Sequence, residues 1–191
     1  MEAFLVSCGI VALAEIGDKT QLLAFILAAK FRKPLPIIAG ILVATLANHA
    51  GAGALGAWLT ALLSPETLRW GLGISFLAMA VWTLIPDTFD ERDSRITRFG
   101  VFGTTVVGFF LAEMGDKTQI ATVALAARYH AFYAVVAGTT LGMMVANVPA
   151  VVLGDRIAQR MPVRLVHAVA AGIFAILGVI TLLGGAARWG L

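Results

Sequence analysis

Two nine-residue segments hold the side chains that could do chemistry, and their sequences are nearly the same. Residues 13–21 read Leu-Ala-Glu-Ile-Gly-Asp-Lys-Thr-Gln, and residues 111–119 repeat this run with Met in place of Ile. Each segment brings two carboxylates, one ammonium group, one hydroxyl and one amide together within a short stretch of chain. Such a repeat predicts two structurally similar halves, each contributing one copy to a shared site.

Oxygen-rich side chains of this kind can bind a metal ion. The candidate metal ligands are the carboxylates of the two segments: Glu15, Asp18, Glu113 and Asp116. Sites made of oxygen alone suit hard divalent cations such as Ca²⁺, Mg²⁺ and Mn²⁺, whereas zinc and copper sites usually include His or Cys. The other polar residues of the segments are expected to support the cation and proton site: Lys19, Thr20, Gln21, Lys117, Thr118 and Gln119.

The charge of the two segments points to an exchange reaction. The four carboxylates and two ammonium groups carry a net charge of −2 when all are ionised. One divalent cation or two protons would neutralise that charge, and carboxylates that interact strongly titrate as a unit. Competition between a metal ion and protons for the same carboxylates is the physical basis of antiport, which is our hypothesis for the function.

A simpler interpretation pairs each glutamate with the lysine four residues later in the same segment, as in many helices. That arrangement leaves Asp18 and Asp116 without partners, and it gives no reason for Thr and Gln to recur as well. We expect instead that the lysines pair with acids in the empty site and release them when the ion arrives.

The composition indicates that these charges lie in a membrane. Of the 191 residues, 60% are hydrophobic and only 13% are charged, and the mean hydropathy is +0.91. A soluble domain of this size has too much surface to cover with so few polar groups. Cys8 is the single cysteine, which excludes a disulfide framework and a cysteine-based zinc site.

Apolar runs of about 20 residues predict membrane-spanning helices. Six such spans are expected, at residues 4–29, 35–63, 68–85, 99–127, 132–153 and 163–183. Both repeated segments fall near the middle of a span, where an ionised side chain costs at least about 2.5–3.5 kcal/mol. Gly17 and Gly115 are places where the spans could break. The expected fold class is therefore an all-α integral membrane protein.

The repeat also predicts how the spans are arranged. Residues 13–29 and 111–127 are identical at 11 of 17 positions, with an offset of 98. Each half, residues 1–86 and residues 99–191, holds three spans, and residues 87–98 form a polar loop between them. Because three is odd, the second half enters the membrane from the opposite side, which makes an inverted repeat like those of many secondary transporters.

Basic residues predict the orientation. Nine Lys and Arg residues fall in the loops that follow the first, third and fifth spans, and three fall on the opposite side. The positive-inside rule then places both termini outside and the central loop in the cytoplasm. The excess of 14 basic over 11 acidic residues is small, and its placement indicates topology rather than nucleic-acid binding.

Three further polar residues lie at membrane depth. Asn48 and Asn147 occupy nearly equivalent places in the second and fifth spans, and they either add amide oxygens to the site or hydrogen-bond between helices. His49 has no counterpart in the second half, so its role as a proton relay or as a packed side chain stays open.

The paired motifs, Glu15-x-Gly-Asp-Lys-Thr20 and Glu113-x-Gly-Asp-Lys-Thr118, resemble the twin signature of a family of cation/proton exchangers. This family includes bacterial manganese exporters of the MneA type and chloroplast and Golgi transporters of manganese or calcium. The resemblance covers essentially the whole chain and implies a secondary transporter that moves Mn²⁺ or Ca²⁺ against protons, with the four acids as cation ligands. The sequence lacks the long N-terminal extension of eukaryotic relatives, so we expect a manganese exporter of the bacterial plasma (inner) membrane.

Two other functions stay open at this point. A passive divalent-cation channel could use the same acids as a selectivity ring, and an intramembrane aspartyl protease could use Asp18 and Asp116 as a dyad. The motifs favour a transporter over an enzyme, with no cofactor, and no ATP-binding signature is present. The expected partners are the transported ion, protons and the lipid bilayer, and a homodimer is compatible with the sequence.

Overall fold

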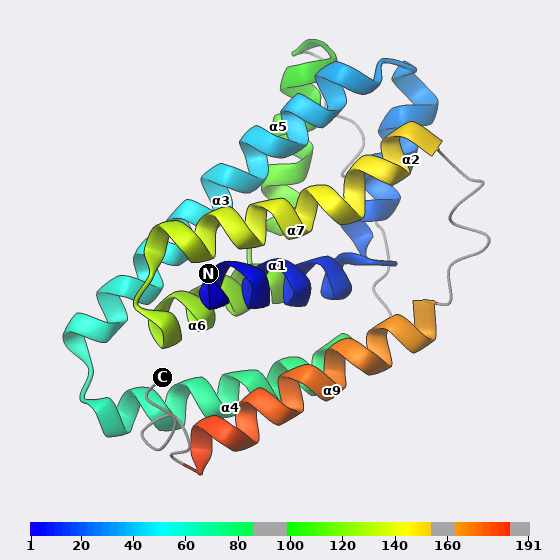
Figure 1. The fold of residues 1–191 in the computed structure, drawn as a ribbon. Coiled ribbons are helices and arrows are strands. Elements are labelled where there is room, and N and C mark those ends of the chain that lie inside the picture. The colour runs from blue at the N-terminus through cyan, green and yellow to red at the C-terminus, as the bar shows by residue number, and fades with distance from the viewer. Residues whose placement is uncertain (86–98, 154–162, 184–191) are drawn as a thin grey trace.

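The computed structural model describes residues 1–85, 99–153 and 163–183, and these residues fold as helices without any strand (Figure 1). The helices of the first half are α1 (Glu2–Glu15), α2 (Lys19–Phe31), α3 (Pro34–Leu62) and α4 (Pro65–Thr83). Those of the second half are α5 (Gly100–Glu113), α6 (Lys117–Tyr129), α7 (Phe132–Leu153) and α9 (Val163–Leu182). The expected cytoplasmic loop, residues 87–98, lies outside the described residues.

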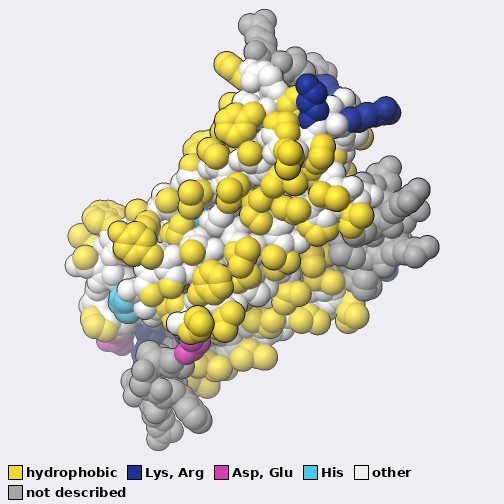
Figure 2. All heavy atoms as spheres, turned by 45° about the horizontal axis from the view of Figure 1, so that its top comes forward, with side chains coloured by type: hydrophobic (Ala, Val, Ile, Leu, Met, Phe, Trp, Pro, Cys, Tyr) yellow, Lys and Arg dark blue, Asp and Glu magenta, His cyan; other side chains and the backbone are white. Residues whose placement is uncertain are grey.

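Three of the described helices are long and apolar enough to cross a membrane: α3, α7 and residues 164–182 of α9. Helix α5 is apolar but shorter. Helix α4 covers most of the third expected span and is long enough, but it is not apolar enough to meet the same standard. Hydrophobic side chains cover most of the face seen in Figure 2, and Lys and Arg side chains gather at one end of it.

The first and fourth expected spans are each broken into two helices. Helix α1 ends at Glu15 and α2 begins at Lys19, while α5 ends at Glu113 and α6 begins at Lys117. The breaks fall in the expected spans at residues 4–29 and 99–127, at the glycine that the sequence had indicated as a place where each span could break. The physical reason is a left-handed backbone at that glycine, described with the site below.

The sequence repeat is also a repeat of backbone conformation. Ile16 has φ −63° and ψ 116°, and Met114, 98 residues later, has φ −61° and ψ 118°. Farther on, α2 and α6 both end at a left-handed residue whose N–H bonds to a carbonyl four residues back. These residues are Arg32 (φ 52°) and His130 (φ 49°), again 98 positions apart.

The two halves pack crosswise on each other through glycines. Gly138 of α7 lies against the carbonyl of Phe4 in α1, so close that an added Cβ would stand 2.4 Å from the oxygen. Gly40 of α3 lies against Phe102 and Thr105 of α5 in the same way, with the Phe102 oxygen 3.0 Å from an added Cβ. Each half thus lays its long unbroken helix on the broken helix of the other half (Figure 1). Small residues permit such close helix crossings in membranes.

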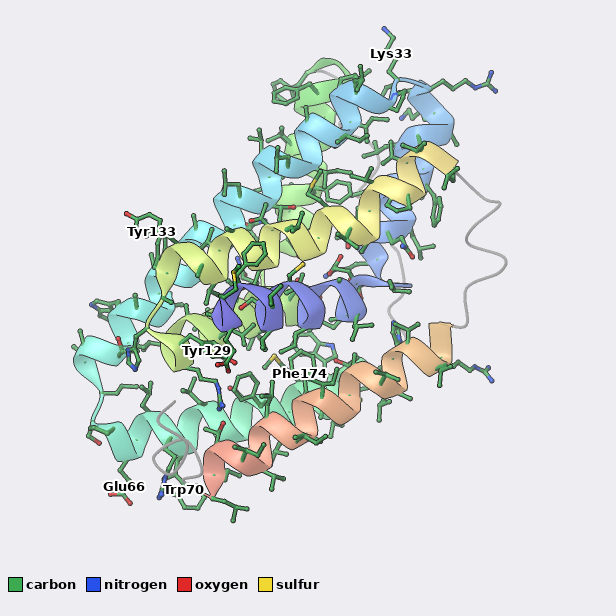
Figure 3. The ribbon with its side chains drawn as sticks, viewed as in Figure 1. Lys33, Glu66, Trp70, Tyr129, Tyr133 and Phe174 are labelled. Carbon is green, nitrogen blue, oxygen red and sulfur yellow. The ribbon has the colours of Figure 1, made fainter. Side chains whose placement is uncertain are left out.

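Helices α4 and α9 form a pair along one side of the molecule (Figure 1). The two helices lie close together at Gly73 and Gly178, and the rings of Phe76 and Phe174 stack with centroids 6.4 Å apart. Phe174 is buried and packs in a hydrophobic cluster with residues of α1 and α6, including Ile10 (Figure 3). The pair therefore packs against α1 and α6, which are one helix from each broken span.

We predict that Gly138→Ala destabilises the protein by about 1–3 kcal/mol, the usual cost of overpacking. The new methyl group would collide with the backbone carbonyl of Phe4, which cannot swing aside as a side chain could. Unfolding in detergent micelles measures the effect. Gly51→Ala in α3 is the matched control, because nothing lies within 4 Å of an added Cβ there. Equal stability of the two variants would contradict the crosswise packing.

Candidate cation site

Both repeated segments form the same helix break. Gly17 has φ +83° and Gly115 has φ +76°, which is left-handed backbone that side chains with a Cβ rarely adopt. The N–H of Gly17 donates to Oε1 of Gln21 at 2.8 Å, and the N–H of Gly115 donates to Oε1 of Gln119 at 2.7 Å. The amide oxygen of each glutamine therefore accepts a hydrogen bond from the backbone of the break. Gln21 also donates from Nε2 to the Ala146 carbonyl at 3.0 Å.

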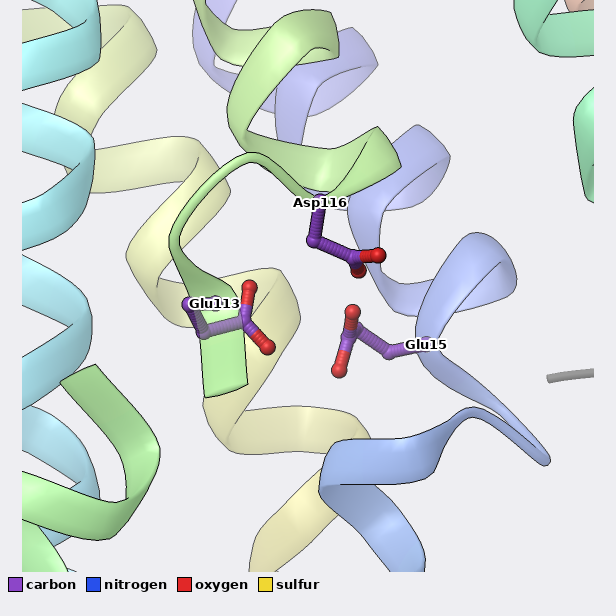
Figure 4. A group of neighbouring side chains, drawn as sticks. All are labelled: Glu15, Glu113 and Asp116. Carbon is purple, nitrogen blue, oxygen red and sulfur yellow. The ribbon is translucent and has the colours of Figure 1, made fainter. Parts of the chain in front are cut away.

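Three of the four predicted carboxylate ligands meet between the breaks. Glu15, Glu113 and Asp116 each offer an oxygen within 4.8 Å of the other two, and the three carboxylates face one another in Figure 4. None of the three residues is more than 1% exposed. Two come from the last turn of a helix and the third from the residue before α6, so the break itself places them.

Each glutamate is held from within its own segment. Thr20 donates its hydroxyl to Oε2 of Glu15 at 2.5 Å, and Thr118 donates to Oε2 of Glu113 at 2.8 Å. The other oxygen, Oε1, of each glutamate is buried and has no hydrogen-bond partner within the described part of the chain. Oδ2 of Asp116 is likewise buried and has no hydrogen-bond partner among the described residues. Three buried acceptor oxygens are thus left for a cation or for protons.

The lysines pair across the two segments rather than within them. Nζ of Lys19 lies 3.1 Å from Oδ1 of Asp116, and Nζ of Lys117 contacts Oδ1 of Asp18. Each lysine thus contacts the aspartate of the other segment, which is a different arrangement from the pairing of glutamate and lysine along one helix.

Asp18 differs from the other three acids. Its carboxylate contacts Lys117 and is not among the oxygens that lie within 4.8 Å of one another. Both aspartates occupy the position before a helix, where Asp usually accepts a backbone N–H, yet neither makes such a cap. Their carboxylates are turned to the lysines instead, and that of Asp116 also to the glutamates.

The two predicted asparagines behave differently from each other. Asn48 donates from Nδ2 to the carbonyl of Phe110 in α5 at 3.1 Å, which is the hydrogen bond between helices that we had weighed against a ligand role. Asn147 donates to Met143 in its own helix at 3.1 Å, and its amide oxygen is buried without a partner in the described residues. His49 is fully buried, and neither ring nitrogen has a hydrogen-bond partner among the described residues.

One contact at the first break had no signal in the sequence. His167 of α9 lies with Nε2 2.7 Å from the carbonyl oxygen of Ile16. The equivalent residue of the second break, Met114, is 56% exposed, whereas Ile16 is partly buried. The two breaks are therefore alike in backbone but unlike in surroundings. The two residues are 151 positions apart in the chain, and the other half has no histidine at the matching position. The sequence therefore carries no pattern that would predict this contact.

Buried carboxylates on paired broken helices are typical of membrane proteins that transport ions. Residues 3–91 and 101–189 both match the family described as "Divalent cation/proton antiporter GDT1", so the chain belongs to this family of transporters. The protease interpretation is thereby excluded, because the family is not one of enzymes. No cofactor is indicated, and the metal ions are transported substrates.

Among curated relatives, the chain is 52% identical to the "Putative manganese exporter" of Vibrio cholerae over 182 residues, covering 95% of this chain and 90% of that protein. It is 27% identical to "GDT1-like protein 3" of Oryza sativa, covering 91% of this chain and 71% of the relative. It is 26% identical to "GDT1-like protein sll0615" of Synechocystis, covering 95% and 97%. No solved structure matches the chain.

We predict that Gly115→Ala lowers the free energy of unfolding by about 1–2 kcal/mol, the cost of a left-handed residue with a Cβ. Nothing lies within 4 Å of an added Cβ there, so the loss arises from backbone strain and not from a clash. Gly115→Asn should lose less, because Asn adopts this conformation more readily. Unfolding in detergent compares the three proteins, and an Ala variant as stable as the parent would refute the left-handed break.

Proposed function

We propose that this protein exports Mn²⁺ from the cytoplasm in exchange for protons that enter, and that Ca²⁺ is its alternative substrate. The observation that carries the proposal is the buried group of Glu15, Glu113 and Asp116, whose oxygens lie within 4.8 Å of one another. A divalent cation between these oxygens would replace the contacts with water that burial has removed. The site therefore has the chemistry that the family's substrate requires.

Exchange follows from the charge that remains when the cation leaves. Three buried carboxylates close together repel one another strongly in a medium of low dielectric constant. Protons are the small cations that can take the place of the metal ion on the same oxygens, since Oε1 of both glutamates and Oδ2 of Asp116 have no partner among the described residues. Metal-bound and proton-bound forms then exclude each other, which is what couples the two fluxes.

We propose for the chain as a whole two inverted repeats of three spans, residues 1–86 and 99–191, that rock about the site. The repeated backbone angles at Ile16 and Met114 support this arrangement. The crosswise packing at Gly40 and Gly138 supports it as well. Broken helices that meet at the ion site are the usual design of transporters built from inverted repeats.

The unequal surroundings of the two breaks support alternating access. Helix α9 contacts the first break through His167, and Met114 of the second break is exposed. A site that is open to one side of the membrane at a time requires the two breaks to have different surroundings. With identical surroundings, the site would be equally open or equally closed to both sides of the membrane. In the opposite state the α4–α9 pair would cover the second break.

The direction of transport rests on the orientation and on the relative from Vibrio cholerae. The distribution of basic residues places both termini outside and residues 87–98 in the cytoplasm of a bacterial plasma membrane. The 52% identical relative carries the name of a manganese exporter, which favours Mn²⁺ over Ca²⁺ and export over uptake. The proton gradient across such a membrane points inward and can drive the export.

Transport in proteoliposomes tests the proposal. We expect Mn²⁺ transport to be faster when the pH gradient drives protons in the direction opposite to that of Mn²⁺. We expect Glu15→Gln and Glu113→Gln each to slow this transport at least about 10–100-fold, because a charged ligand is lost. Glu66→Gln is the matched control and should transport normally, since the side chain of Glu66 is 79% exposed at the start of α4.

Two results would overturn the proposal in different ways. Mn²⁺ flux that ignores an imposed pH gradient would make the protein a passive channel. Full activity in both glutamate variants would remove the proposed site. Competition by Ca²⁺ and Mg²⁺ in the same vesicles establishes which divalent cation is preferred.

A further inference from the structure

We infer that Lys19 and Lys117 set the charge selectivity of the cation site, each by neutralising the aspartate of the opposite motif. The inference rests on the proposed function, since it concerns the same site. Neither lysine can be a metal ligand while its ammonium group is charged, because that group has no lone pair to offer. Their contribution is a fixed positive charge beside the cation.

The geometry places this charge where it acts on the bound ion. Asp116 offers Oδ1 to Nζ of Lys19 at 3.1 Å, while its carboxylate belongs to the group with Glu15 and Glu113. One carboxylate thus faces a lysine and the cation position together. Lys117 contacts Asp18 on the other side of the site, and both of these residues are buried.

The charge count then matches one divalent ion. The four acids carry −4 and the two lysines +2, so that the site keeps a net −2. Without a lysine the same oxygens would carry −3, and the added attraction would be greater for a trivalent than for a divalent cation. The lysines therefore limit how strongly the site prefers a trivalent over a divalent cation. If the lysines only held the two halves together, replacing them would change the affinity for all cations by the same factor.

Lys19 is the better position for a test. Its side chain is 26% exposed, whereas that of Lys117 is fully buried, so that a neutral residue at position 19 disturbs the interior less. Lys19→Gln gives a net charge of −3, Asp116→Asn gives −1, and the double variant returns to −2. Lys19→Arg keeps the charge, and Lys30→Gln removes a lysine near the end of α2, outside the site.

The measurement is binding of Mn²⁺ and of Tb³⁺ to the purified full chain in detergent, with Tb³⁺ luminescence and its displacement by Mn²⁺ as readouts. We expect Lys19→Gln to shift the ratio of the two dissociation constants towards Tb³⁺ by about tenfold or more. Asp116→Asn should shift it the other way. The double variant should return to the parent ratio although both affinities fall with the lost ligand.

The Arg and Lys30 variants should keep the parent ratio. The inference is overturned if the ratio of the two dissociation constants stays within twofold of the parent value in both Lys19→Gln and Asp116→Asn. If one of these variants does not fold, the other variant alone decides the test. Failure of the proposed function looks different, because the parent protein would then bind no Mn²⁺ or move it without regard to protons. Normal coupling in the parent together with an unchanged ratio refutes the selectivity role alone.

Discussion

Three carboxylates buried within reach of one another are the constraint on which the rest of this structure depends. Like charges in a medium of low dielectric constant repel strongly, and their burial is tolerated only when opposite charges and hydrogen bonds compensate. Three polar neighbours contribute to that compensation: the hydroxyls of Thr20 and Thr118, and the ammonium group of Lys19 from the opposite half. What remains uncompensated is the set of oxygens that a cation or protons would occupy.

The helix breaks make this arrangement possible at membrane depth. A continuous helix would direct Glu15 and Asp18 along one face and bond their backbone groups within the helix. The left-handed glycine turns the chain so that one helix ends and another begins at the site, and the following glutamine satisfies the freed N–H. Crosswise packing at Gly40 and Gly138 then holds the two breaks against each other.

The sequence predicted the parts of the site that depend on residue type and spacing. The repeat and the membrane character followed from the sequence pattern and the composition, and the glycines were indicated as places where a helix could break. All four acids were predicted as ligands, and three of them cluster in the structure. It did not predict which residues would be partners in the folded protein. Lys19 and Lys117 each contact the aspartate of the other motif. Gln21 accepts a hydrogen bond from the backbone of the break, and Asn48 donates to the Phe110 carbonyl. Spacing along a helix identifies neighbours on that helix only, so contacts between helices required the fold itself.

A symmetric sequence has produced an asymmetric molecule, and this asymmetry has a physical origin. The two copies of the motif have similar backbone angles, with φ +83° at Gly17 and +76° at Gly115, yet in the described part of the chain His167 contacts only the first break. The α4–α9 pair is a single body on one side of the molecule, and it cannot contact both breaks equally while it lies against α1 and α6. Under the proposed alternating access, the pair would take one of two equivalent positions, and either position would leave the other break uncovered. A carboxylate site between two unequally covered breaks would then open to one side of the membrane at a time, which is the condition for coupling the movement of one ion to that of another.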